Sequence, residues 1–186
     1  MQLIREINIK TMGWKRYMRL MMLGGGLALI FIGLFGSELM TGDNLTNGWT
    51  GLMYRLEITL MAVVICTILH EALHGIFFKI YTGRVKFGVA FHKIMLVAPY
   101  ATSLGSIIRR DKMIMIALAP QILTILIMLA FIYDGYSPMI KMGLVWLGAF
   151  NLGGGCMDIY TVTQVMKEKG DIYTEDTKTG MKIYRA

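Results

Sequence analysis

Two histidines and a glutamate lie within one helical turn of each other in the middle of an apolar stretch. His70, Glu71 and His74 form the pattern H-E-x-x-H, which on a helix places both imidazoles on one face, where they can share a Zn²⁺ ion. Glu71 lies between them and can exchange a proton with a water molecule that zinc activates. Such polar side chains are costly in an apolar span unless they face a cavity and bind something. A hydrogen-bonded cluster without metal is the alternative.

Four apolar segments are long enough to cross a bilayer, and the second of them carries this motif. They comprise residues 20–40, 58–78, 113–133 and 142–165. At about 1.5 Å rise per residue, each matches a hydrocarbon core of about 30 Å. The composition agrees, with 55% hydrophobic and only 17% charged residues. We therefore predict one domain of the all-α membrane class with four transmembrane helices. A cleaved signal peptide is the rival interpretation of the first segment, although its apolar run is longer than such a peptide needs.

The placement of the basic residues predicts the orientation of these helices. The net charge is +7, and seventeen of the nineteen Lys and Arg residues precede the first span, separate the second from the third, or follow the fourth. Only Arg55 and Lys141 fall on the other side. By the positive-inside rule, the basic face is cytoplasmic and both termini lie there. The charge is therefore a topology signal, and we expect the lipid bilayer, not nucleic acid, as its partner.

A catalytic zinc site normally has three protein ligands and one open position, so the chain must supply a third ligand. Asp158 is the best placed by depth, because its helix is predicted to run parallel to the helix of the histidines and all three fall about 18 to 24 Å from the outer face. Three other carboxylates fall at the opposite face: Glu38, Glu57 and Asp134. His92 is a weak candidate because it faces away from the apolar side of a predicted strand. A helix-end carboxylate bound to water or to Lys167 is the alternative role for Asp158.

The fourth span is interrupted by small and polar residues. Asn151 and Asp158 flank the run 153–155 of three glycines, which indicates a bent segment that opens onto the site. Asn151 can donate to the substrate carbonyl or to the developing oxyanion, and an interhelical hydrogen bond is its alternative role. Cys66 and Cys156 are interpreted as packing residues. The third span, interrupted only at Pro120 and its neighbour Gln121, is expected to form a wall of the site.

Two segments outside the spans have strand patterns. In the cytoplasmic or re-entrant connection 79–112, apolar residues from Val85 to Phe91 alternate at period two, and a second apolar run, 94–98, ends at Pro99. We predict a short membrane-associated β-hairpin there, after the second helix. The cytoplasmic tail, residues 166–186, is expected to form a small C-terminal hairpin.

The chain also resembles known proteins. The helix with His70-Glu71-Ala72-Leu73-His74-Gly75 and the later helix with Asn151 and Asp158 look like the core of the site-2 proteases. Nearly the whole chain resembles a small bacterial family of zincin peptidases related to them. The further features that carry this resemblance are the Pro120 helix, the stretch 153–158 and the tail with Gly170-Asp171 and residues 176–180.

This resemblance implies a helical membrane core that brings two histidines and an aspartate to zinc near the cytosolic side. His70, His74 and Asp158 are then the ligands, Glu71 is the catalytic acid/base, and the protein lies in the bacterial cytoplasmic membrane as a multi-pass protein. Site-2 proteases usually have a proline-containing segment and Leu-Asp-Gly around the third ligand. Here Met157-Asp158-Ile159 follows a glycine run instead.

We therefore predict a zinc-dependent endopeptidase that cleaves a membrane protein or peptide near the cytoplasmic side of the bilayer. A metal or proton transporter could use the same polar cluster, but transporters usually spread ionisable residues along a path and often have paired repeats. An inert membrane scaffold is a third possibility. A prenyl-protein-processing type of zinc protease is disfavoured, because its glutamate ligand would have to be Glu168, beyond the last span.

Overall fold

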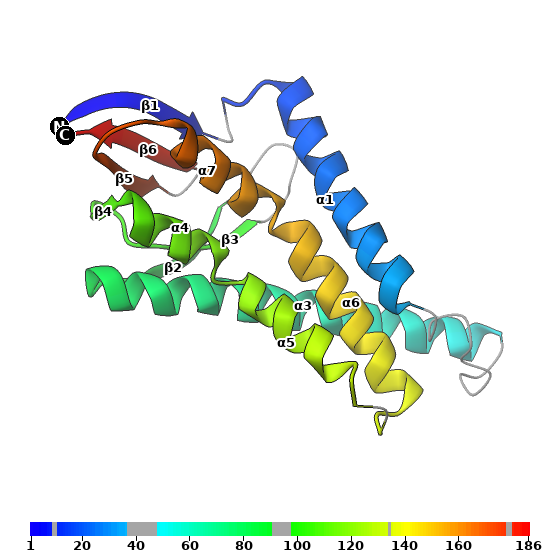
Figure 1. Cartoon of the computed structure of the whole chain (residues 1–186). Coiled ribbons are helices and arrows are strands. Elements are labelled where there is room, and N and C mark those ends of the chain that lie inside the picture. Colours follow the sequence, from blue (N-terminus) through cyan, green and yellow to red (C-terminus); the bar gives the residue numbers. More distant parts are fainter. Residues whose placement is uncertain (9–10, 37–47, 91–97, 134, 178–179) are drawn as a thin grey trace.

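The computed structural model describes residues 1–8, 11–36, 48–90, 98–133, 135–177 and 180–186. The protein is mostly helical, and a small sheet lies at one end of the helices together with both termini (Figure 1). The helices are α1 (Trp14–Phe35), α3 (Trp49–Thr82), α4 (Arg110–Leu118), α5 (Gln121–Ala130), α6 (Pro138–Gly154) and α7 (Cys156–Lys167). The strands are β1 (Gln2–Asn8), β2 (Lys86–Ala90), β3 (Ala98–Thr102), β4 (Ile107–Arg109), β5 (Ile172–Thr177) and β6 (Gly180–Arg185).

Three helical segments are long and apolar enough to span a membrane: Trp14–Phe35, Trp49–Thr82 and Arg110–Ala130. They overlap the first three predicted spans. Their outer faces carry exposed aliphatic side chains such as Leu29, Leu60 and Ile125, as expected of helices that contact lipid. Helix α3 has 34 residues and is therefore about 51 Å long, so it extends well beyond a hydrocarbon core. The end that carries His70 is the end near the sheet.

The fourth predicted span consists of two helices instead of one. Helix α6 has 17 residues and α7 has 12, and they meet at Gly155. A Cβ atom on Gly155 would lie 2.5 Å from Nε2 of Gln121, so only glycine lets the α5 side chain approach the backbone this closely. The interruption expected from the glycine run is present. That the pair α6–α7 crosses the membrane as a fourth span stays a prediction.

Helices α4 and α5 are separated at Pro120. In a continuous helix, the N–H of residue 120 would donate to the carbonyl oxygen of Ile116, but proline has no N–H. The Ile116 carbonyl is left with a 3.2 Å bond from the Ala119 N–H and has capacity for a second donor. The Ile116 carbonyl can therefore accept a hydrogen bond from a side chain, here that of His74.

The sheet is larger than the sequence pattern predicted, so the all-α class is corrected to a mostly helical protein with a small sheet. Four antiparallel strands have the order β1-β6-β5-β4. The predicted C-terminal hairpin, β5 with β6, is confirmed. Strands β1 and β4 were not expected, because each pairs with a segment far away in the sequence.

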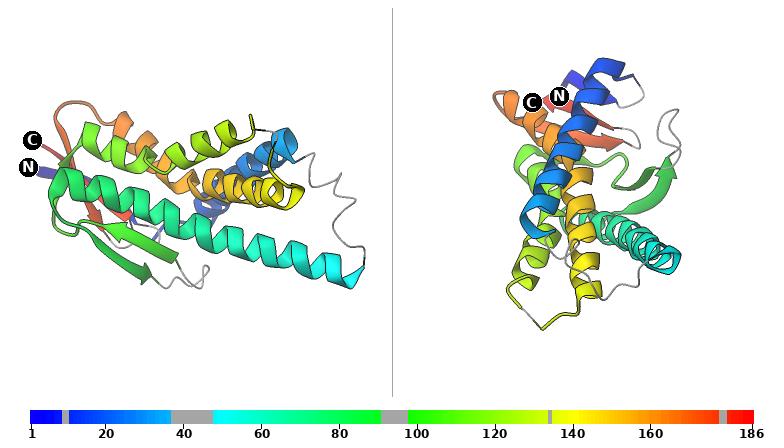
Figure 2. Two further views of the ribbon diagram at one scale, coloured as in Figure 1. Left: turned by 90° about the horizontal axis from the view of Figure 1, so that it is seen from below. Right: turned by 90° about the vertical axis from the view of Figure 1, so that its right-hand side faces the viewer.

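A second, two-stranded sheet forms the predicted hairpin after the motif helix, and β3 lies against α3 (Figure 2). Strand β2 agrees with the period-two pattern. Its partner was placed wrongly, because β3 begins at Ala98 and includes Pro99, whereas residues 91–97 lie outside the described part. Pro99 is tolerated because its nitrogen points to the same outer edge as that of Ala101, away from β2, where the ladder needs no donor.

The core lies between the sheet and the ends of the helices. Buried side chains from the four-stranded sheet, α3, α4 and α7 form one cluster, which includes Ile183, Phe78, Ile116 and Val165. Arg5 of β1 also binds α7 directly, through Gln164 at 2.9 Å, and the adjacent Glu168 at 2.9 Å. The sheet therefore holds the C-terminal ends of α3 and α7 in place relative to each other.

Candidate metal centre

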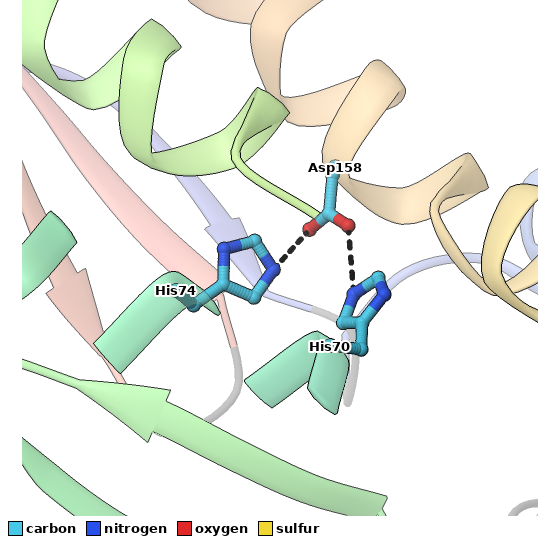
Figure 3. Close-up of side chains that lie close together, drawn as sticks. All are labelled: His70, His74 and Asp158. Carbon is cyan, nitrogen blue, oxygen red and sulfur yellow. Dashed lines mark ion pairs between the residues drawn. The ribbon is translucent and has the colours of Figure 1, made fainter. Parts of the chain in front are cut away.

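Three side chains from two distant segments converge near the sheet end of the helices. His70 and His74 lie one turn apart on α3, and Asp158 lies in the first turn of α7 (Figure 3). Nε2 of His70 is 3.2 Å from Oδ2 of Asp158, and Nε2 of His74 is 3.4 Å from Oδ1 of Asp158. One ligand atom from each residue lies within 4.8 Å of those of the others. This group could hold a metal ion.

The far nitrogen of each histidine binds an oxygen atom that fixes its ring. Nδ1 of His74 lies 2.8 Å from the main-chain oxygen of Ile116, the carbonyl that Pro120 leaves available. Nδ1 of His70 lies 3.0 Å from Oδ1 of Asn151. Because both partners are hydrogen-bond acceptors, each Nδ1 carries the hydrogen and donates it. Hydrogen bonds of this kind usually orient histidine ligands at metal sites.

Asn151 connects the two helix breaks to the histidine pair. Its side chain is completely buried, and its amide nitrogen donates to the Pro120 carbonyl at 2.8 Å and to Oγ1 of Thr124 at 2.8 Å. These two acceptors decide which end of the amide is nitrogen, so the oxygen faces His70. Both amide hydrogens are used in this arrangement. The oxyanion role expected for Asn151 stays a prediction, whereas the geometry is that of a residue that positions His70.

The donor set fits a zinc ion. A histidine that binds a metal is neutral, and in a neutral ring with hydrogen on Nδ1 the Nε2 atom presents a lone pair, here toward the carboxylate of Asp158, which also offers lone pairs. Oδ2 of Asp158 is buried and has no hydrogen-bond donor among the described residues. Lone pairs that point at one another repel, and a cation bound between them removes this repulsion. The separations of 3.2 and 3.4 Å are close to the edge of a tetrahedron with metal–ligand bonds of about 2.0–2.1 Å.

Glu71 is held beside the three ligands by a strand edge. The main-chain N–H of Ala101 in β3 donates to Oε2 of Glu71 at 2.6 Å. Glu71, His74 and Asp158 line a cavity of about 210 Å³. The other main contributors to its wall are β3, α4 and the inner face of the four-stranded sheet. The remaining lining residues are Ile7, Phe78, Ala90, Pro99, Tyr100, Ala101, Met113, Ile116, Ala117, Met157, Thr161, Asp176, Thr177, Gly180 and Met181.

The structure brings together His70, Glu71, His74, Asn151 and Asp158, all of which the sequence singled out. Asp158 contacts the two histidines, which favours the ligand role over that of a helix-end carboxylate. His92 lies outside the described residues, as do Glu38 and Asp134. Cys66 and Cys156 are buried and free.

Sequence reasoning missed the groups that support this cluster: the Ile116 and Pro120 carbonyls, Thr124 and the Ala101 N–H. Main-chain groups leave no side-chain signal in a sequence. A proline in the middle of an apolar span was the one available hint, because it frees a carbonyl at a defined position.

The comparison with protein families agrees with this geometry. Residues 63–173, more than half of the chain, match the model of a family described as "Putative zincin peptidase". The chain belongs to this family. The matched region begins on α3 before His70 and extends beyond Asp158, so it contains the whole cluster. No curated protein and no solved structure matches the chain.

Proposed function

We propose that this protein is a zinc-dependent intramembrane endopeptidase that cleaves a membrane-associated protein or peptide near the cytoplasmic side. The observation that carries the proposal is the convergence of His70, His74 and Asp158 at Glu71. Glu71, His74 and Asp158 line one small cavity, and His70 completes the group of three possible metal ligands. Membership of the zincin peptidase family supports the reaction class.

The membrane placement follows from the helices and the charges. Three helices have the length and composition of membrane spans, and α6 with α7 is proposed as a fourth, bent one. Seventeen of nineteen basic residues fall on the side predicted to be cytoplasmic. Both termini belong to neighbouring strands of one sheet, which supports their location on the same side. The proposed metal centre lies next to that sheet, and hence at the cytoplasmic end of the spans in a bacterial inner membrane.

Each residue has a distinct part in the proposed chemistry. His70, His74 and Asp158 would hold the zinc ion. When bound, zinc lowers the pKa of water and polarises the carbonyl of the scissile bond. Glu71 is positioned to accept a proton from the attacking water and to deliver it to the leaving amine. The Ala101 N–H holds one carboxylate oxygen of Glu71 and leaves the other, Oε1, for the proton.

A strand edge beside Glu71 suggests how a substrate binds. Proteases act on extended chains, and an exposed strand edge can pair with one. β3 lies against α3, and its Ala101 N–H binds Glu71, so an extended substrate held beside this strand would pass the catalytic carboxylate. A hairpin after the motif helix and ligands from two helices also support the proposed relationship to the site-2 proteases.

The test compares the purified wild type with Glu71→Gln, His70→Ala and Asp158→Ala. Zinc content and cleavage of a panel of single-span membrane substrates in vesicles are measured for each. We expect Glu71→Gln to retain zinc and lose cleavage, while His70→Ala and Asp158→Ala lose both. The transporter alternative would be favoured by metal flux into the vesicles without cleavage that depends on Glu71. A wild type without stoichiometric zinc would refute the proposal.

A further inference from the structure

The inner face of the four-stranded sheet is mostly apolar, and a carboxylate lies at one end of it. In β5 the residues that face inward alternate, and the first two, Ile172 and Thr174, are buried. The hydroxyl of Thr174 is satisfied by the Ile108 carbonyl at 3.1 Å. The next inward residue is Asp176, and its neighbour across the sheet is the buried Met181. The carboxylate of Asp176 thus ends a row whose other polar side chain, Thr174, already has a hydrogen-bond partner, at the point where the sheet meets the catalytic cavity.

No cation among the described residues balances the charge of Asp176. It lines the same cavity as Glu71, His74 and Asp158, and no lysine or arginine is among the described lining residues. Neither does Asp176 take part in an ion pair between described residues. A zinc ion would balance the negative charges of Asp158 and Glu71. The negative charge of Asp176 is then not balanced within the described lining of the cavity. The proposed reaction does not use this carboxylate.

Two unsatisfied hydroxyl groups lie close in sequence to the strand edge that binds Glu71. Thr102 and Ser103 are almost completely buried, and their Oγ atoms have no hydrogen-bond partner of good geometry among the described residues. Burial raises the pKa of Asp176 to about 7, and the nearby Thr102 hydroxyl only partly opposes this shift. Buried polar groups without partners cost stability. Asp176 lines the cavity with only the Thr102 hydroxyl as a hydrogen-bonding neighbour among the described residues, so this carboxylate is expected to receive a ligand that supplies a hydrogen-bond donor and a positive charge.

We propose that Asp176, with Thr102 beside it, forms a subsite that binds a protonated amine of the substrate. This amine is either a basic side chain near the scissile bond or the free α-amino group of the peptide. The inference rests on the proposed peptidase function and narrows its substrate class. Asp176 touches the substrate but takes no part in bond cleavage. Because a hydrogen bond to a charged group contributes about 1.5–3 kcal/mol, the subsite favours amine-bearing substrates by about 10- to 100-fold.

The first experiment compares cleavage of three peptide pools by the zinc-loaded full-length protein in vesicles. One pool has free amines, one has blocked α-amino groups and one has blocked lysine side chains. We expect the wild type to lose about 10- to 100-fold in rate on one blocked pool, which identifies the source of the amine. Asp176→Asn is expected to lose this preference, so that its relative rates on the three pools become equal.

Glu175→Gln is the matched control, because Glu175 is the adjacent acidic residue and binds Tyr184 on the opposite face of the sheet, at 2.7 Å. This variant is expected to keep the preference. Equal cleavage of all three pools by the wild type, or an unchanged preference in Asp176→Asn, would overturn the subsite. If the wild type shows no cleavage that depends on Glu71, the proposed function fails, and the subsite is decided by the second experiment.

The second experiment does not need activity. Thermal unfolding is measured at pH 8 with butylamine, agmatine or the neutral N-butylacetamide, in Glu71→Gln and in the double variant that also has Asp176→Asn. The amines are expected to raise the melting temperature of the first protein only, and the amide that of neither. Asp176→Asn alone is expected to melt higher than the wild type and to retain its zinc. Equal amine shifts in both proteins, no shift, a lower melting temperature, or loss of a metal equivalent would overturn the subsite.

Discussion

Removing the Asn151 side chain is expected to weaken zinc binding without touching a ligand. In the structure this amide makes three hydrogen bonds, two as donor to Pro120 and Thr124 and one as acceptor from His70. In Asn151→Ala the ring of His70 loses the oxygen that fixes its orientation and its tautomer. Loss of such a partner typically lowers metal affinity about 10- to 100-fold. We therefore expect a dissociation constant for zinc that is higher by this factor.

The same change should also destabilise the fold. Asn151 is completely buried, so water cannot readily replace its bonds, and each buried group left unpaired costs about 1–3 kcal/mol. Because the partners relax in part, we expect a loss of about 3 kcal/mol in the free energy of unfolding of the zinc-free protein. Zinc affinity is measured by competition with a chelator, and stability by thermal unfolding in detergent.

Thr124→Val separates the two effects. It removes one acceptor of the Asn151 amide but leaves the contact between Asn151 and His70 intact, so stability should fall while zinc affinity stays within about threefold of the wild type. Asn151→Ala would refute the positioning role if its zinc affinity were unchanged. Unchanged affinity with a large loss in kcat would instead favour the oxyanion role that the sequence suggested.

Three further outcomes are expected. Pro120→Ala supplies an N–H that competes with His74 for the Ile116 carbonyl, so zinc affinity should fall about three- to tenfold in the same chelator titration; an unchanged affinity would show that the freed carbonyl is unimportant. Gly24→Leu should lower the melting temperature sharply, because a Cβ there would lie 2.5 Å from the Gly153 carbonyl oxygen. Gly25→Leu, with nothing within 4 Å of its Cβ, should not lower it. Equal effects of the two changes would contradict the close contact between α1, which carries Gly24, and α6, which carries Gly153. The raised pKa of Asp176, about 7, means that the folded state holds its proton more tightly than the unfolded state. The wild type should therefore lose stability relative to Asp176→Asn as pH rises from about 4 to 7, with a constant difference above pH 7; a difference independent of pH in thermal unfolding would contradict the assignment.

Much of the site was predictable because its chemistry lies in side chains at recognisable spacing. H-E-x-x-H is a local pattern on one helix, and its geometry follows from the helical repeat alone. Asp158 is more than eighty residues away, yet two regularities led to it: charge placement predicted the direction of its helix, and the rise per residue predicted its depth. The structure brings the three side chains to within ligand distance of each other.

The sheet was harder to predict because its pairing is non-local. β1 pairs with β6 at the other end of the chain, and β4 pairs with β5, which is also far away in the sequence. Nothing in the local pattern of residues 2–8 identifies β6 as their partner. The period-two pattern predicts the first strand of the hairpin after α3. It does not predict the bounds of the second strand, because Pro99 is expected to end the strand pairing and instead lies within β3. Only the structure shows that the nitrogen of Pro99 faces away from β2, where a proline does not remove a hydrogen bond of the sheet.

The sequence by itself determined the apolar spans, the side chains of the candidate metal centre and the glutamate beside them, because composition and helical periodicity are local properties. The tertiary structure decided how these groups are held. It assigned the Ile116 and Asn151 oxygens to the two histidines and the Ala101 N–H to Glu71, and it brought Asp176 from the sheet into the same cavity. These contacts join main-chain groups and residues far apart in the chain, and their partners are set by packing, which no local pattern encodes.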